Sequence, residues 1–198
     1  PGLPTRTMLP RSEKEYDDIV KRAVAWLIRH QRSDGAWTDS RYVMCPDPKL
    51  LPNVFTAVAA LAAAALLEWR DVDPKACDAA REKAEKYLLD ENHVNRKNNE
   101  ECYADGYRLL YLSRKAALVK EGKEATLKRM SEIAAKLAAS QVKNGMWAHE
   151  YPNPFCTASV LWCLQQAKAA GAGVDATMME KAAAALKDWT SPRTPWGD

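Results

Sequence analysis

Two heptapeptides of the chain share the pattern Q-x-x-[DN]-G-x-W: Gln31-Arg32-Ser33-Asp34-Gly35-Ala36-Trp37 and Gln141-Val142-Lys143-Asn144-Gly145-Met146-Trp147. They begin 110 residues apart, and a leucine precedes each tryptophan by ten residues, at Leu27 and Leu137. A repeated seven-residue pattern is far more specific than a single match. Because internal repeats with periods of about 20 to 50 residues are typical of solenoids and rings of helices, the pattern predicts a repeat architecture.

Further copies of the motif are degenerate. Leu186 precedes Trp196 by ten residues, which indicates a partial copy near the end of the chain, 49 residues after Trp147. A repeat length of about 49 residues predicts one more copy between the two intact motifs, which begin 110 residues apart. Ten residues after Leu88 stands Asn98, in the polar stretch 92–99, which lacks Gln, Gly and Trp. The second repeat has therefore lost its motif.

The composition fits one domain over residues 1–198. The net charge is +3, with 29 basic and 26 acidic residues interspersed, so we expect a solvated helical surface and no nucleic-acid partner. The longest apolar run, Val54 to Leu67, is too short to span a bilayer. It predicts a buried helix and no transmembrane segment.

The five cysteines, at 45, 77, 102, 156 and 163, show no C-x-x-C spacing. Their odd number favours reduced thiols, and hence a cytoplasmic location, over a complete disulfide framework. The chain opens without Met, shows no signal-peptide pattern and stops inside a partial motif. We expect an N-terminus that has been processed or trimmed and a chain cut from a longer protein, which leaves the compartment open.

Capping signals divide almost the whole chain into helices, and no strand is predicted. Ser12-Glu13-Lys14-Glu15 is a capping box, Asn53 is expected to cap the second helix, and Asp73-Pro74 is expected to open the third. Seven helices are predicted, at about 12–31, 53–69, 73–89, 100–118, 123–141, 155–170 and 176–189.

The predicted helices alternate in character. The first, third and fifth are amphipathic, whereas 54–67 and 158–164 are apolar nearly all round, which indicates an outer and an inner layer of stacked helical hairpins. The predicted units are an extended arm, three hairpins and a partial repeat, at 1–11, 12–70, 73–119, 122–171 and 175–198.

With Thr56-Ala57 and Thr157-Ala158 opening the helices that follow, the two motifs resemble the repeats of squalene/terpene cyclases and protein prenyltransferase β-subunits, the α/α-toroid superfamily. The resemblance covers about residues 20–197. It implies an all-α, incomplete toroid, because the family's rings contain more hairpins than this chain supplies. It also implies that the motif residues brace the end of an outer helix against the next hairpin; these structural residues are Gln31, Gly35, Trp37, Gln141, Gly145 and Trp147.

The catalytic motifs of that superfamily are altered in this chain. The nearest match to the cyclases' acidic D-x-D-D motif is Asp71-Val72-Asp73-Pro74, in which Asp73 is expected to cap a helix, so no catalytic residue is assigned. The resemblance to prenyltransferases implies a zinc site, for which Glu100, Cys102 and Cys156 are the candidate ligands. Two of the three ligand types differ from the family's, and buried packing is the alternative for the cysteines. No other cofactor is expected.

Polar residues on the fourth predicted helix require an explanation. Asp105 and Arg108 are three residues apart on an inner helix, beside Tyr103 and Tyr107. These four residues form a candidate ligand-binding patch. The alternative is that Asp105 and Arg108 form an internal ion pair or contact neighbouring loops. His30, His93 and His149 are each isolated in the sequence.

Three functions remain open. Intact repeats with altered catalytic motifs favour a module that binds a hydrophobic ligand or a protein partner and lacks cyclase activity. The alternatives are part of a divergent isoprenoid-processing enzyme and a purely structural or assembly segment. The expected partners are an isoprenoid or another hydrophobic small molecule, and further repeats or a second copy covering the uncapped ends.

Overall fold

Capping residues, apolar runs and glycine turns make the described part of the chain almost entirely helical. The computed structural model describes residues 12–37, 51–118, 120–149 and 151–189. These contain seven α-helices: α1 (Glu13–His30), α2 (Leu51–Glu68), α3 (Pro74–Leu89), α4 (Glu101–Leu118), α5 (Lys123–Ser140), α6 (Pro154–Ala170) and α7 (Ala176–Trp189). The predicted arm 1–11 and the partial motif ending at Trp196 lie outside the described residues.

Three shorter features occupy the connections. The 3-10 helices η2 (Arg70–Val72) and η3 (Glu91–His93) follow α2 and α3. The two-residue strands β1 (Ala148–His149) and β2 (Tyr151–Pro152) pair antiparallel. This pair is the only strand structure in the described ranges, and it shapes the loop before α6.

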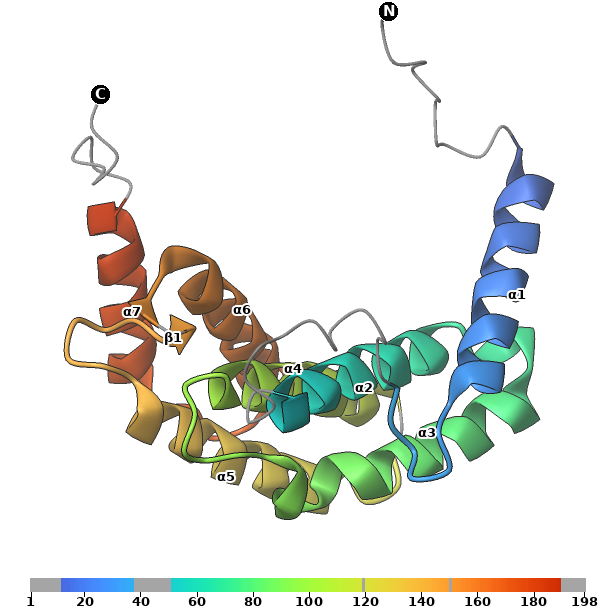
Figure 1. Cartoon of the computed structure of the whole chain (residues 1–198), viewed down its shortest axis with the longest axis horizontal. Helices are drawn as coiled ribbons and strands as arrows, with labels where there is room; N and C mark the ends of the chain where they lie inside the picture. The colour runs from blue at the N-terminus through green and yellow to red at the C-terminus, as the bar shows by residue number, and fades with distance from the viewer. Residues whose placement is uncertain (1–11, 38–50, 119, 150, 190–198) are drawn as a thin grey trace, which may run out of the picture.

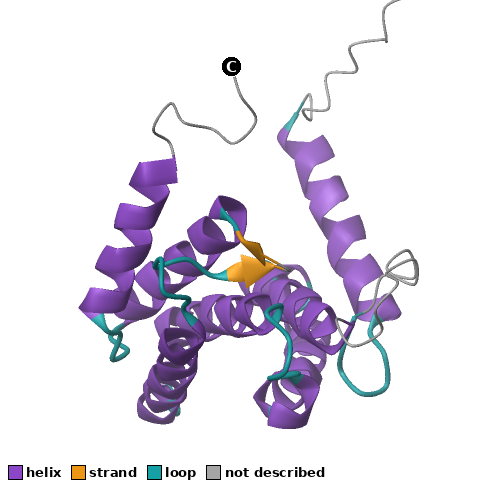
Figure 2. Ribbon diagram, turned by 60° about the vertical axis from the view of Figure 1, so that its left-hand side comes forward, coloured by secondary structure: helices purple, strands orange, loops and turns teal. Residues whose placement is uncertain are grey.

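The helices form two layers (Figure 1). Helices α2, α4 and α6 lie side by side in an inner layer, with α4 packed against both of the others; α2 and α6 are apolar, whereas α4 also carries charged residues. The outer helices α3 and α5 cover one side of this layer, while α1 and α7 stand at its two ends (Figures 1 and 2). The core lies between the layers and includes fully buried Leu66, Leu109, Ile133 and Leu164.

The most extensive packing within a hairpin joins an inner helix to the outer helix that follows it: α2 to α3, α4 to α5, and α6 to α7. Short turns connect these pairs, whereas the longer motif loops lead from an outer helix to the next inner one. The packing unit is therefore offset by one helix from the predicted hairpins 12–70, 73–119 and 122–171.

Two of the predicted caps are confirmed and one is wrong. The side chain of Ser12 accepts the Glu15 N–H, and that of Asp73 accepts the Ala76 N–H. α2 begins two residues before Asn53, at Leu51. The buried Asn53 amide instead pairs with both backbone groups of Asn95, at 3.0 and 2.8 Å. Asn53 thus ties α2 to the loop after α3.

Both motif tryptophans are buried, and each closes its loop back onto the preceding outer helix. The indole N–H of Trp37 donates to the Leu27 carbonyl at 2.8 Å, and that of Trp147 donates to the Leu137 carbonyl at 2.9 Å. The ten-residue spacing between leucine and tryptophan is the spacing of this hydrogen bond.

The motif glutamines reach forward to the next outer helix. Gln31 Nε2 donates to the carbonyls of Gly35, at 3.0 Å, and of Ala80 on α3, at 2.7 Å. Gln141 repeats the arrangement with Gly145 and with Met178 on α7, both at 2.9 Å. Each motif therefore connects two successive outer helices.

The motif glycines are required by both conformation and space. Gly35 and Gly145 have φ values of 95° and 87°, where side chains are disfavoured. A Cβ atom on Gly35 would lie 2.3 Å from the Lys83 carbonyl oxygen of α3, and one on Gly145 would lie 2.7 Å from the Lys181 carbonyl oxygen of α7. The loops lie directly against the backbone of the next outer helix.

Gly35→Ala should destabilise the protein much more than Gly122→Ala. Gly122 also has positive φ, but a Cβ there would meet nothing within 4 Å. The control therefore carries only the left-handed backbone cost of roughly 1–2 kcal/mol, whereas Gly35→Ala must also displace α3. Urea unfolding of both variants measures the difference, and equal losses would mean that the loop does not need its close contact with α3.

Candidate functional site

The four residues of the candidate patch on α4 lie on two different sides of the helix. Tyr103 and Tyr107 are half-buried, and their rings stack with centroids 6.5 Å apart. Asp105 and Arg108 are each only 1% exposed and form an ion pair of 2.9 Å. Both side chains are enclosed by protein and paired with each other, which is the arrangement of the alternative interpretation, an internal ion pair.

Asp105 and Arg108 belong to a larger ionic cluster around Glu91 in η3. We call it the Glu91 cluster; its members are Glu91, Arg96, Asp105, Arg108, Arg129 and Lys136. The Glu91 carboxylate forms ion pairs with Arg96 at 2.7 Å, Arg108 at 2.8 Å, Arg129 at 2.5 Å and Lys136 at 2.7 Å. Arg96 also pairs with Asp105. One carboxylate thus holds four cations from the loop, α4 and α5.

The Glu91 cluster occupies the loop that lost its motif. In the intact repeats a glutamine connects one outer helix to the next; here Arg129 and Lys136 of α5 reach back to Glu91, just beyond α3. Arg129 also donates to the Leu89 carbonyl at the end of α3, at 3.1 Å. The cluster therefore connects α3 to α5 in place of the motif.

Burial and ion pairing oppose each other at Glu91. Burial would raise the pKa of this carboxyl, but hydrogen bonds from Lys136, Arg96 and Arg108 hold it far below the ordinary value of 4.5. The pKa of the Arg96 guanidinium is raised despite its burial, through its contacts with Asp105 and Glu91. Both groups are therefore charged in the folded protein at neutral pH.

The three candidate zinc ligands are divided between two pairs. Glu100 is buried and contacts His149 Nδ1, while the Cys102 and Cys156 sulfurs contact each other. Within the described residues, no three His, Cys, Asp or Glu side chains are arranged to hold a metal ion. The residues present do not fit a zinc centre. His149, which is isolated in the sequence, has neighbours in the fold: besides Glu100, the Tyr103 ring lies beside it, with ring centroids 5.9 Å apart.

Cys102 and Cys156 meet where α4 and α6 begin. Their sulfurs are 3.0 Å apart, and the Cys102 thiol donates to the Ala148 carbonyl at 3.4 Å. The contact with Cys156, followed by burial, raises the pKa of the Cys102 thiol far above its usual range. The Cys102 thiol is therefore protonated in the folded protein at neutral pH.

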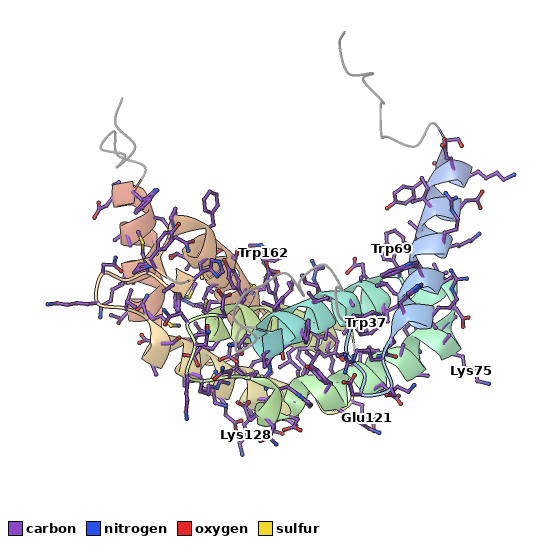
Figure 3. All side chains as sticks on the ribbon, viewed as in Figure 1. Trp37, Trp69, Lys75, Glu121, Lys128 and Trp162 are labelled. Carbon is purple, nitrogen blue, oxygen red and sulfur yellow. The ribbon has the colours of Figure 1, made fainter. Side chains whose placement is uncertain are left out.

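Large apolar side chains are exposed on inner helices, which is unusual for a core layer. Phe155 and Trp162 on α6 are 82% and 44% exposed, and Leu61 on α2 is also exposed. The helices together form an arc, and Figure 3 shows Trp162 on its concave side, together with Trp69 near α1. Residues 52–67 and 154–167 contain no charged residue. These stretches of α2 and α6 thus offer uncharged surface with large apolar side chains to solvent.

Sequence reasoning missed the partners of the Asp105–Arg108 pair and of Glu100. Glu91, Arg96, Arg129 and Lys136 look like ordinary surface charges, because their sequence separations follow no local pattern. One signal was present: a charged pair on an inner helix needs counter-charges, and the polar loop before it was the nearest source. No comparable signal links Glu100 to His149.

No family model, curated protein or solved structure matches the chain. In the part of the chain that the structure describes, none of the helices combines the length and apolar character needed to cross a membrane.

Glu91→Gln should lower stability by about 1–3 kcal/mol at neutral pH, since it weakens charge-assisted hydrogen bonds. Because the folded-state pKa of Glu91 lies below its ordinary 4.5, its contribution is complete above about pH 4.5 and declines as the pH falls below it. Urea unfolding should show the difference from wild type shrinking in acid.

The matched control is Glu68→Gln, which removes an exposed pair with Arg114 and should cost less than about 1 kcal/mol. A pH-independent effect of Glu91→Gln, or one no larger than that of Glu68→Gln, would contradict the role given to the cluster.

Proposed function

We propose that this chain is a helical repeat module, related to the toroid repeats of terpenoid cyclases and prenyltransferases, whose inner layer binds a hydrophobic ligand. The observation that carries the proposal is the exposure of Phe155 and Trp162 on an inner helix. Exposed apolar surface on a layer that otherwise forms the core is typical of binding sites.

The exposed side chains follow continuous helical stripes. On α6, Phe155 and Trp162 are seven residues apart and therefore share a face. On α2, the partly or fully exposed Val58, Leu61 and Ala65 follow the same spacing. Between these helices, α4 contributes the stacked Tyr103 and Tyr107. Three adjacent helices thus provide neighbouring apolar surface.

The ends of the arc provide further apolar surface. α1 is amphipathic but has a single buried residue, Val24, among those described. Its exposed Tyr16 contacts Trp69 with ring centroids 5.9 Å apart, and Trp26 is half exposed. This surface extends the hydrophobic face of the inner layer toward α1 and suits a bulky ligand.

The altered motifs favour binding over catalysis in this proposal. Asp73 belongs to the stretch that best matches the cyclases' acidic motif. Its side chain accepts the Ala76 N–H at the start of α3 and therefore caps that helix. Glu100 is paired with His149. A bound hydrophobic molecule would contact aromatic faces, which stabilise apolar and cationic groups alike.

Binding can be tested with farnesol as the probe and isothermal titration calorimetry as the measurement. Trp162→Ala should weaken farnesol binding by about tenfold, or roughly 1.4 kcal/mol, because it removes the largest exposed side chain of α6. Leu118→Ala is the control: Leu118 is also exposed, but it lines a polar hollow with Glu68 and Arg70. It should leave binding unchanged.

Equal binding by wild type and Trp162→Ala, or no binding to farnesol or dodecanol, would contradict the proposal. Sedimentation equilibrium on the same samples identifies the other outcome. A dimer that Trp162→Ala abolishes, without farnesol binding, would show that a second copy covers this face and would support an assembly function.

A further inference from the structure

We propose that Cys102 and Cys156 form a reversible disulfide under oxidation by a peroxide, which links the start of α4 to the start of α6. The two sulfurs already lie 3.0 Å apart although the residues are separated by 54 positions. A disulfide bond measures about 2.05 Å, so the sulfurs need to approach by only about 1 Å. The fold has brought two distant thiols within reach of one bond.

The pair differs from the other described cysteines. Cys77 makes a long contact of 4.0 Å with the Trp69 carbonyl. Cys163 lies in the core, where burial raises the pKa of its thiol to about 12. Neither has another sulfur as a described partner, so among the four described cysteines Cys102 and Cys156 are the two placed to form an intramolecular disulfide.

The surroundings of the pair allow access from one side. Cys102 and Cys156 are almost completely buried, but their neighbours are not: His149 has 40% of its side chain exposed and Tyr103 is half-buried. The Ala148 carbonyl, which accepts a hydrogen bond from the Cys102 thiol, belongs to the two-residue strand β1. The proposal requires only that this short loop move enough to admit a small oxidant from the side of His149.

The reaction balances with one peroxide. One cysteine thiol gives up its proton as its sulfur attacks one oxygen of the peroxide; the O–O bond breaks, the sulfur becomes a sulfenic acid, and the leaving hydroxide takes up the proton and departs as water. The second thiol attacks the sulfenic sulfur, forms the S–S bond and releases a second water. Two thiols and one hydrogen peroxide give one disulfide and two waters, and a dithiol reductant reverses the change.

The disulfide would act on the surface proposed to bind ligand. Cys102 directly precedes Tyr103, and Cys156 directly follows Phe155. A bond between them fixes the spacing of the two helices that carry these aromatic side chains. It also closes a long loop of the chain, which restricts the unfolded state. The oxidised form is therefore the more stable one.

The test exposes the reduced full chain to graded hydrogen peroxide, blocks free thiols with N-ethylmaleimide and measures the intact mass and the linked peptides. The expected result is a loss of two blocked thiols, a single linkage between the peptides of Cys102 and Cys156, and reversal by dithiothreitol. The melting temperature should rise on the order of 5 °C or more.

Cys102→Ser and Cys156→Ser should abolish the linkage and the shift in melting temperature, while Cys77→Ser should keep both. Oxidation of single thiols without a linkage, a different cysteine pair, or disulfide-linked dimers would overturn the proposal. If a serine variant does not fold, the linked peptides of the wild type still decide the question. Farnesol binding is not part of the readout, so the two proposals can fail separately.

Discussion

The direct contact between each motif loop and the backbone of the next outer helix is the constraint on which the rest of the fold depends. Gly35 lies against Lys83 of α3, and Gly145 lies against Lys181 of α7. Since no side chain fits between loop and helix, peptide groups set how closely each motif loop approaches the next outer helix. The indole and amide hydrogen bonds of the same motifs hold the loops in place. The inner helices then pack within this frame, and α4 joins α2 to α6.

The middle loop achieves the same connection with charges. The Glu91 carboxylate gathers side chains from α4 and α5, and the buried Arg108 is balanced by Glu91 and Asp105. Desolvating such groups is costly, so the cluster is a specific connection more than a strong one. The two kinds of brace also respond differently to acid. The motif contacts are made by neutral groups, whereas the cluster depends on a carboxylate that can be protonated.

Local signals in the sequence predicted the helices well, because caps such as Ser12 and Asp73 act within four residues. The seven helices and their alternation between layers followed from these caps and from apolar periodicity. Asn53 was misassigned because an asparagine before an apolar run resembles a cap, while its actual partner is 42 residues away. Glu100 and His149, and the partners of Glu91, were missed for the same reason: they meet only after the loops are placed. Cys102 and Cys156, which the family resemblance placed at one site with Glu100, do meet, but as a pair of thiols.

The most direct test of this account is the equilibrium unfolding of Trp147→Ala, measured beside Trp162→Ala. Trp147 is fully buried and donates to the Leu137 carbonyl, whereas Trp162 is 44% exposed. The account predicts a loss of about 3–5 kcal/mol for Trp147→Ala and a much smaller loss for Trp162→Ala. Similar losses in the two variants would mean that the motif tryptophan does not brace the outer helices, and the structural basis proposed for the repeats would be wrong.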